Sequence, residues 1–314
     1  MTIIDRILQS QLFKDQPPVL IDIGASGEIN AKWAAIAPYS ICLAFDADDR
    51  EFHITEAVDK TYKKLITVNR IVTAQPTDKT SFYLTASPFC SSLLEPDKDK
   101  LEPWIFSSLF TVDKITSLQA TTISDALRQA GIAYIDWFKT DTQGTDLRLY
   151  NSLPEEVRSG ILAAEFEPGI MDAYKGEDKL YTIMQQMHGA DYWLSSMEVK
   201  GTQRLHKDYV RDISPFFAQR MLRKTPGWAE ITYLRQPGPL TARQILLLYV
   251  FALVEKQYGF AIEIAAHGKG LFPQEPLFGT CHQAAVKKLT AGKRSAPLVF
   301  IKRQINKLFA NIHD

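Results

Sequence analysis

The sequence predicts an α/β protein, built on a doubly wound, mostly parallel sheet of roughly seven strands and followed by a helical C-terminal extension. Short apolar runs that end in glycine or aspartate are typical of strands buried on both faces. These runs alternate with helical stretches, as in successive βαβ units. With 314 residues, 46% of them apolar, the chain is long enough to bury a substantial core.

The expected elements follow in order. A helix in residues 1–16 stops at Pro17 and Pro18, because proline cannot continue a helix. Strands are expected at 19–23, 40–45, 65–72, 80–84, 135–140, 161–166, 192–199 and 230–234. Helices are expected at 31–37, 50–60, 123–130, 147–153 and 177–187, with an irregular segment at 87–116.

The chain divides into three predicted parts: an N-terminal helix in 1–16, a nucleoside-binding domain in 17–236 and a helical, basic extension in 237–314. The boundary is the Gln-Pro-Gly-Pro linker at 236–239. Between Lys287 and Lys307 stand seven basic residues and no acid. Because Pro297 interrupts this segment, a solvated basic face is favoured over docking on an anionic membrane or an acidic partner.

Composition limits the partners and the compartment. Thirty-six basic residues balance thirty-six acidic ones, so the protein has no net positive charge that would attract nucleic acid. Nucleic acid is therefore not expected as a partner. Three widely spaced cysteines suit reduced thiols. The first residues lack the layout of a secretory signal. The most apolar run, 245–254, is about half the length of a membrane span and is expected to be a core helix. We therefore expect a cytoplasmic protein.

The turn after the first strand has the composition of a nucleoside-binding loop. Gly24, Ser26 and Gly27 occupy this turn, where backbone must approach a bound group. A dinucleotide loop would need glycine where Ser26 and Ile29 stand, and no P-loop is present. Asp22 precedes the first glycine and would repel a pyrophosphate, whereas it suits the ammonium or sulfonium of S-adenosylmethionine. The cationic cofactor is therefore favoured.

The second strand ends at Asp46 and Ala47, which we expect to contact the cofactor. Asp46 lies nineteen residues after Gly27, the spacing at which an acidic residue accepts hydrogen bonds from both ribose hydroxyls. At a later strand end, Lys139 and Asp141 are two residues apart and share one side of the strand. They could form an ion pair, either at a functional site or as a structural pair.

Five blocks of the sequence resemble, in order, the FkbM-type methyltransferases. They are residues 19–27, 45–46, 122–127, 138–147 and 164–167. The most specific block runs from Lys139 to Asp146 and is similar to that family's lysine, apolar, aspartate, any, glutamate or glutamine, glycine, any, acid signature. The resemblance covers about residues 17 to 235 and stops before the helical extension.

The resemblance implies a class I methyltransferase fold that binds S-adenosylmethionine and methylates a hydroxyl of a small molecule or glycan. The positions that match the family's cofactor site are Asp22, Gly24, Gly27 and Asp46. The sequence also departs from the family. Aspartate replaces the common glutamate at 46 and at 146, and serine stands at 124 where an aspartate often precedes Asp125. These departures suggest a divergent member.

A hydroxyl acceptor must lose its proton during methyl transfer, so a carboxylate near the methyl group is expected to act as general base. Asp141 and Glu165 stand at strand ends and are the candidates, with Lys139 orienting Asp141. The resemblance also suggests that the loop at 90–92 contacts cofactor or acceptor, although a surface loop rich in serine is an alternative.

Three alternatives remain at this point. Magnesium is one alternative, because its preferred ligands are oxygens and Asp141, Glu165 and Glu167 could supply them. Zinc is not supported, because Cys281 and His282 lack the spacing of a zinc site. The favoured prediction is that no metal is bound. The sheet could also be a catalytically silent nucleoside-binding scaffold or an interaction protein. A nicotinamide oxidoreductase is disfavoured, because the required glycines are missing.

Overall fold

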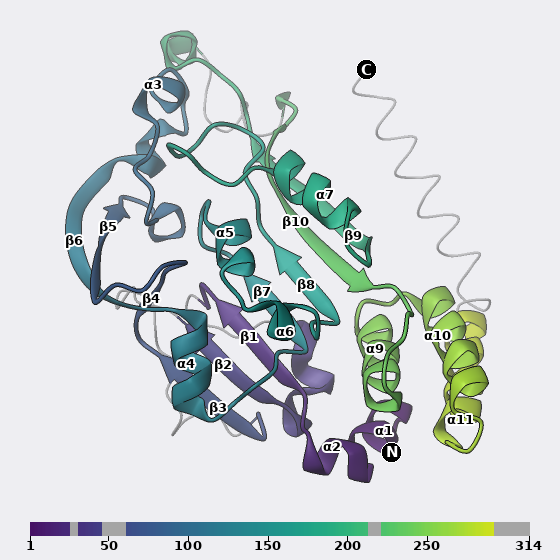
Figure 1. The fold of residues 1–314 in the computed structure, drawn as a ribbon. Helices are drawn as coiled ribbons and strands as arrows, with labels where there is room; N and C mark the ends of the chain where they lie inside the picture. Colours follow the sequence, from purple (N-terminus) through teal and green to yellow (C-terminus); the bar gives the residue numbers. More distant parts are fainter. Residues whose placement is uncertain (26–30, 46–60, 213–220, 292–314) are drawn as a thin grey trace. The chain divides into compact units, whose positions relative to one another are not determined.

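The computed structural model describes residues 1–25, 31–45, 61–212 and 221–291 (Figure 1). Its internal contacts divide the chain into two compact units. One unit is Leu8–Gly238, and the other combines Met1–Ile7 with Pro239–Asp314. Each unit is described by itself below.

The larger unit is built on a seven-stranded sheet. Its strands are β1 (Val19–Ile23), β2 (Ile41–Phe45), β3 (Lys64–Val68), β7 (Trp137–Thr140), β8 (Ala163–Phe166), β9 (Tyr192–Thr202) and β10 (Thr225–Arg235). They lie in the order β3-β2-β1-β7-β8-β10-β9 (Figure 1). Strands β3, β2, β1, β7 and β8 run parallel to one another, and β10 runs antiparallel to both of its neighbours, β8 and β9. The predicted α/β fold with a mostly parallel, Rossmann-like sheet is thus confirmed.

The centre of this sheet is buried on both faces, as the unbroken apolar runs predict. All five residues of β1 are buried. Phe138 of β7 packs edge-on against Tyr150 with the ring centroids 5.5 Å apart, and Tyr150 packs in the same way against Phe166 of β8. Trp33 and Trp137 form another edge-on pair at 5.8 Å. These large rings account for much of the apolar surface that the central strands bury.

A second sheet, which the sequence analysis missed, has the order β4-β6-β5. It consists of β4 (Ile71–Val72), β5 (Lys79–Thr85) and β6 (Val112–Thr121). The predicted strand at 65–72 is therefore two strands in two sheets, and the strand at 80–84 leaves the main sheet. The end of the segment at 87–116 belongs to β6, which pairs antiparallel with β5. The apolar residues of β6 stand at 112, 115, 118 and 120, without the strict alternation of a strand, and most of its residues are exposed or half-buried, so the sequence resembles a loop.

Between β5 and β6 the chain forms three short helices: η3 (Pro88–Cys90), α3 (Lys98–Leu101) and η4 (Ser107–Phe110). The predicted helix in 1–16 is instead two helices, α1 (Ile3–Leu8) and α2 (Gln11–Asp15). The expected helix at 31–37 consists of two 3-10 turns, η1 (Ala31–Ala35) and η2 (Ala37–Tyr39), because Pro38 disrupts it. The expected helix at 50–60 lies outside the described residues.

The remaining helices of this unit are α4 (Ile123–Ala130), α5 (Asp146–Asn151), α6 (Glu155–Arg158), α7 (Leu180–His188) and η5 (Lys207–Asp212). Helix α4 has the predicted bounds because both of its ends are capped. The Thr122 side chain accepts a hydrogen bond from the amide of Asp125, and Gly131 ends the helix in the left-handed conformation, with φ of 69°.

In the other unit, α9 (Ala242–Val254), α10 (Tyr258–Leu271) and α11 (Leu277–Ala291) pack against one another. A capping box of Thr241 and Gln244 starts α9. The Tyr249 hydroxyl donates to the carbonyl oxygen of Cys281 at 2.8 Å. The run 245–252 is fully buried, which confirms the predicted core helix. Among the described residues, no helix has both the length and the apolar character that crossing a membrane requires.

Candidate functional site

A cavity of about 670 Å³ lies at the carboxyl ends of the parallel strands. Gly24 follows β1, Phe45 ends β2, Asp141 follows β7 and Glu167 follows β8, and all four line the cavity. In an open α/β sheet, ligands bind in the crevice outside these strand ends. The cavity is therefore the candidate functional site of the larger unit.

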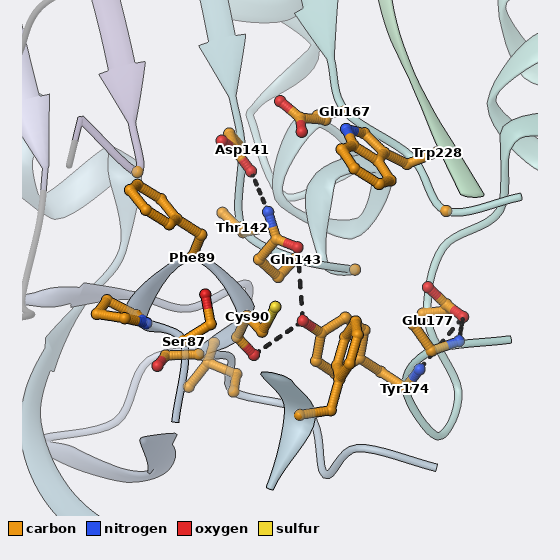
Figure 2. Close-up of a pocket in the computed structure, with 18 of the residues that line it drawn as sticks. Ser87, Phe89, Cys90, Asp141, Thr142, Gln143, Glu167, Tyr174, Glu177 and Trp228 are labelled. Carbon is orange, nitrogen blue, oxygen red and sulfur yellow. Dashed lines mark hydrogen bonds between the residues drawn. The ribbon is translucent and has the colours of Figure 1, made fainter. Parts of the chain in front are cut away.

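The opposite walls of the cavity are mainly aromatic. Phe89 and Phe110 come from the segment between β5 and β6, Tyr174 comes from the segment after β8, and Trp228 lies in β10. Figure 2 shows Phe89, Tyr174 and Trp228 arranged around Asp141 and Gln143. The cavity thus combines carboxyl and amide groups at the edge of the sheet with aromatic rings, of which Trp228 belongs to the sheet itself and the others to the covering segments.

Gly24 is required where the ends of β1 and β7 meet. Its φ is 84°, a conformation that L side chains rarely adopt, and a Cβ atom there would stand 1.9 Å from the carbonyl oxygen of Asp141. The amide of Asp141 in turn donates to the carbonyl oxygen of Ile23 at 2.9 Å. The predicted close approach of backbone at Gly24 is thus to the chain segment that carries Asp141.

Behind these strand ends lies an inner row of charges in register: Asp22 on β1, Lys139 on β7 and Glu165 on β8. Lys139 Nζ lies 2.6 Å from Asp22 Oδ1, and Lys32 Nζ lies 2.9 Å from Glu165 Oε2. Burial by itself would lower the pKa of Lys139, but the charges of Asp22, Asp141 and Glu165 raise it above its ordinary value. Lys139 is therefore a cation at neutral pH.

The partner of Lys139 differs from the one considered from sequence. Asp141 shares its side of the strand, but the ion pair forms with Asp22, because the parallel register places Asp22 directly beside Lys139. Asp22 is fully buried, and its Oδ2 atom has no hydrogen-bond partner among the described residues. Asp22 does not line the cavity.

Asp141 and Glu167 form a carboxyl pair on the cavity wall. Burial raises the pKa of Asp141, while the charge of Lys139 and hydrogen bonds from Gln143 and Glu167 oppose this rise. Burial and the nearby charge of Asp141 raise the pKa of Glu167 to about 9. Burial thus raises the pKa of both carboxyl groups on this wall, and the charge of one carboxylate disfavours ionisation of the other.

A chain of hydrogen bonds runs from this pair to the aromatic side of the cavity. Gln143 Nε2 donates to Asp141 Oδ1 at 2.7 Å. The Tyr174 hydroxyl lies 3.5 Å from Gln143 Oε1 and donates to the carbonyl oxygen of Cys90 at 2.8 Å (Figure 2). Gln143 has a φ of 54°, and such left-handed backbone in a residue other than glycine is often found at functional sites.

Asp146 fixes the loop that carries these groups. Its Oδ1 accepts hydrogen bonds from the amide and the hydroxyl of Thr142, at 3.0 and 2.6 Å, and its Oδ2 accepts one from the amide of Glu167 at 2.7 Å. Burial raises the pKa of Asp146 to about 6, although these hydrogen bonds oppose the rise. Asp146 thereby ties the loop after β7 to the end of β8.

Only some of the site residues predicted from the sequence line the cavity. Gly24 and Asp141 line the cavity, as do Cys90 and Ser91 from the loop at 90–92. The inner row, Asp22, Lys139 and Glu165, does not line it. The expected cofactor contacts Ser26, Gly27, Asp46 and Ala47 lie outside the described residues.

Three residues of the cavity were missed as functional candidates: Gln143, Tyr174 and Trp228. Glu167 was considered only as a metal ligand. Its position two residues after Glu165 places both side chains on one side of the strand, and this spacing could have suggested it. The described residues contain no group of three or more histidine, cysteine or acidic side chains placed to hold a metal ion.

Comparison of the chain with known protein families gives no matching family model, and comparison with curated proteins gives no match. The class of protein is therefore defined by the structure alone. The chain is an α/β protein with a Rossmann-like sheet and a cavity at the carboxyl ends of its parallel strands.

Proposed function

We propose that this chain is an S-adenosylmethionine-dependent methyltransferase of the FkbM type, acting on the hydroxyl of a small molecule or glycan. The observation that carries this proposal is the order of the sheet. Numbered along the chain within the main sheet, the strands lie in the order third, second, first, fourth, fifth, seventh, sixth, and only the seventh is antiparallel to its neighbours. A mostly parallel sheet of seven strands supports the class I methyltransferase fold that the sequence resemblance implies.

The residues of the cavity suit a cationic cofactor. Gly24 and Phe45 line the cavity at the ends of β1 and β2, and Phe45 adds an apolar surface there. The carboxyl groups of Asp141 and Glu167 line the same cavity, and acidic groups suit a sulfonium or ammonium better than a pyrophosphate. When bound, S-adenosylmethionine supplies a methyl group that its sulfonium already activates.

The side chains of the cavity then have to position the acceptor hydroxyl and take its proton. Asp141 is proposed as the general base, because its carboxyl group lines the cavity at the end of β7. Gln143 Nε2 donates a hydrogen bond to Asp141 Oδ1 at 2.7 Å and so orients the carboxyl group. Asp141 is favoured over Glu165, since Glu165 is ion-paired with Lys32 and does not line the cavity.

The test is calorimetric binding of S-adenosylhomocysteine to the full chain, which requires no knowledge of the acceptor. We expect micromolar binding that is lost in Asp46→Ala, because Asp46 is the proposed ribose ligand. Asp78→Ala is the control, since Asp78 is an exposed acid that does not line the cavity. Absence of binding by the folded chain would instead favour the catalytically silent scaffold.

A further inference from the structure

Polar groups and rings occupy different parts of the cavity wall. The carboxyl pair and Gln143 stand together at the edge of the sheet, whereas the segments opposite contribute aromatic side chains (Figure 2). Phe110 packs edge-on against Tyr174 with the ring centroids 5.7 Å apart, and against Phe106 at 6.4 Å. Phe106, Phe110 and Tyr174 thus form one connected group of rings.

Phe89 is the most exposed of these rings. Its side chain is 66% exposed although it lines the cavity, and Figure 2 shows it directed toward the region in front of Asp141 and Thr142. Trp228 lies beside Glu167 across the same space (Figure 2). An apolar ligand placed between Phe89 and Trp228 would bury ring surface that is otherwise in contact with solvent.

Two polar groups beside these rings, the Tyr174 hydroxyl and Glu177 Oε1, are already engaged within the protein. The Tyr174 hydroxyl donates to the carbonyl oxygen of Cys90. Glu177 Oε1 accepts from the amide of Ala173 and from Lys179 Nζ, at 2.7 and 2.6 Å. A sugar presents hydroxyl groups on all sides and requires a matching number of polar partners, because unpaired polar groups are costly to bury. This wall is poorly suited to such a ligand.

We propose that the acceptor is an aromatic alcohol, whose ring packs between Phe89 and Trp228 and whose hydroxyl faces Asp141 and Glu167. This proposal rests on the proposed function and selects the small-molecule class over the glycan. A lone pair of the hydroxyl oxygen forms the new bond to the methyl carbon. The electrons of the breaking carbon–sulfur bond stay on sulfur, which becomes a neutral thioether, and the hydroxyl proton passes to the Asp141 carboxylate.

The experiment is calorimetry of the full chain, with and without saturating S-adenosylhomocysteine, using β-naphthol and methyl glucoside as probes. We expect β-naphthol to bind and methyl glucoside not to bind. Phe89→Ala and Trp228→Ala should each weaken β-naphthol binding about tenfold, because each removes one aromatic contact. The matched control is Tyr181→Ala: Tyr181 is 73% exposed on α7 and does not line the cavity, so its removal should leave the affinity unchanged.

The outcomes separate this inference from the proposed function. Preferred binding of methyl glucoside, or β-naphthol binding that Phe89→Ala and Tyr181→Ala affect equally, overturns the aromatic acceptor. Binding of S-adenosylhomocysteine without binding of β-naphthol also overturns it and leaves methyl transfer standing. Binding of β-naphthol that depends on Phe89 and Trp228, without any binding of S-adenosylhomocysteine, overturns methyl transfer and leaves an aromatic binding site. Because Phe89 is exposed, its alanine variant should fold.

Discussion

Two acid-rich regions lie only two residues apart on the same strands, and they differ in how their charges are matched. In the inner row, Asp22 is bound by Lys139, and Glu165 is bound by Lys32. At the cavity wall, Asp141 and Glu167 both line the cavity, and burial raises the pKa of both. The inner row is a set of ion pairs, whereas neither acid of the wall forms an ion pair with another of the described residues.

This difference indicates which of the two regions is suited to proton transfer. A matched buried pair has both charges satisfied and gains little from a ligand. A buried carboxyl group with a raised pKa can accept or donate a proton closer to neutral pH than an exposed one, which is the property that a general base needs. Alternation along β7 and β8 places both regions on one side of the sheet, so only the distance along the strand separates them.

The largest effect is expected for Lys139→Met, which leaves Asp22 buried without its cation. Breaking a buried pair in this way should lower the free energy of unfolding by about 3–5 kcal/mol. Denaturant unfolding measures this loss. Arg128→Met is the control, because Arg128 pairs with Asp125 at the surface and should cost less than about 1 kcal/mol. Equal losses for the two variants would show that the inner row is not a buried structural pair.

Asp141→Asn should reduce methyl transfer about 100-fold or more, since it removes the proposed base, while the affinity for S-adenosylhomocysteine stays within a few-fold. Single-turnover methyl transfer and calorimetry measure the two quantities on the same preparation. Glu165→Gln is the matched variant from the inner row, and it should keep most of the turnover of the folded chain. The reverse order of effects would move the base from the cavity wall to the inner row.

Gly24→Ala should lower the free energy of unfolding by about 2–3 kcal/mol, because it combines an unfavourable φ with a clash against the carbonyl oxygen of Asp141. Gly131→Ala is the control for the effect of a positive φ without a steric clash. Gly131 has a φ of 69° but has no atoms within 4 Å of an added Cβ, so its substitution should cost about 1 kcal/mol. A similar loss in both variants would argue against a tight junction between β1 and the Asp141 loop.

The smallest effect is a gain in stability for Glu167→Gln. The pKa of Glu167 is raised to about 9, so the stability that its neutral form contributes is complete below about pH 4 and is lost as the pH rises toward 9. A permanently neutral glutamine should therefore raise Tm by about 2–4 °C at pH 8, and by less as the pH falls toward 4. Thermal unfolding at several pH values measures this trend.

The control for that trend is Glu156→Gln, because Glu156 is exposed on α6. It should change the free energy of unfolding by less than about 0.5 kcal/mol at every pH. A gain for Glu167→Gln that is independent of pH would contradict the raised pKa of Glu167.

The sequence predicted the elements whose signals are local. The apolar run of β1 and the capped helix α4 have the expected bounds, because burial on both faces and capping by Thr122 and Gly131 depend on neighbouring residues. The second sheet was missed, because β6 is largely exposed and its pairing with β5 joins residues far apart in the chain. Pairing of that kind leaves little trace in periodicity.

By itself, the sequence determined the alternation of strands and helices, the need for glycine after the first strand and the candidacy of Asp141. Only the tertiary structure decided which charges meet. The parallel register places Lys139 beside Asp22, and Lys32 of η1 pairs with Glu165. Asp141 and Glu167 instead line the cavity, where burial raises the pKa of both. Spacing along one strand fixes the side on which a residue lies, whereas its partners come from neighbouring strands and from the loops that cover them.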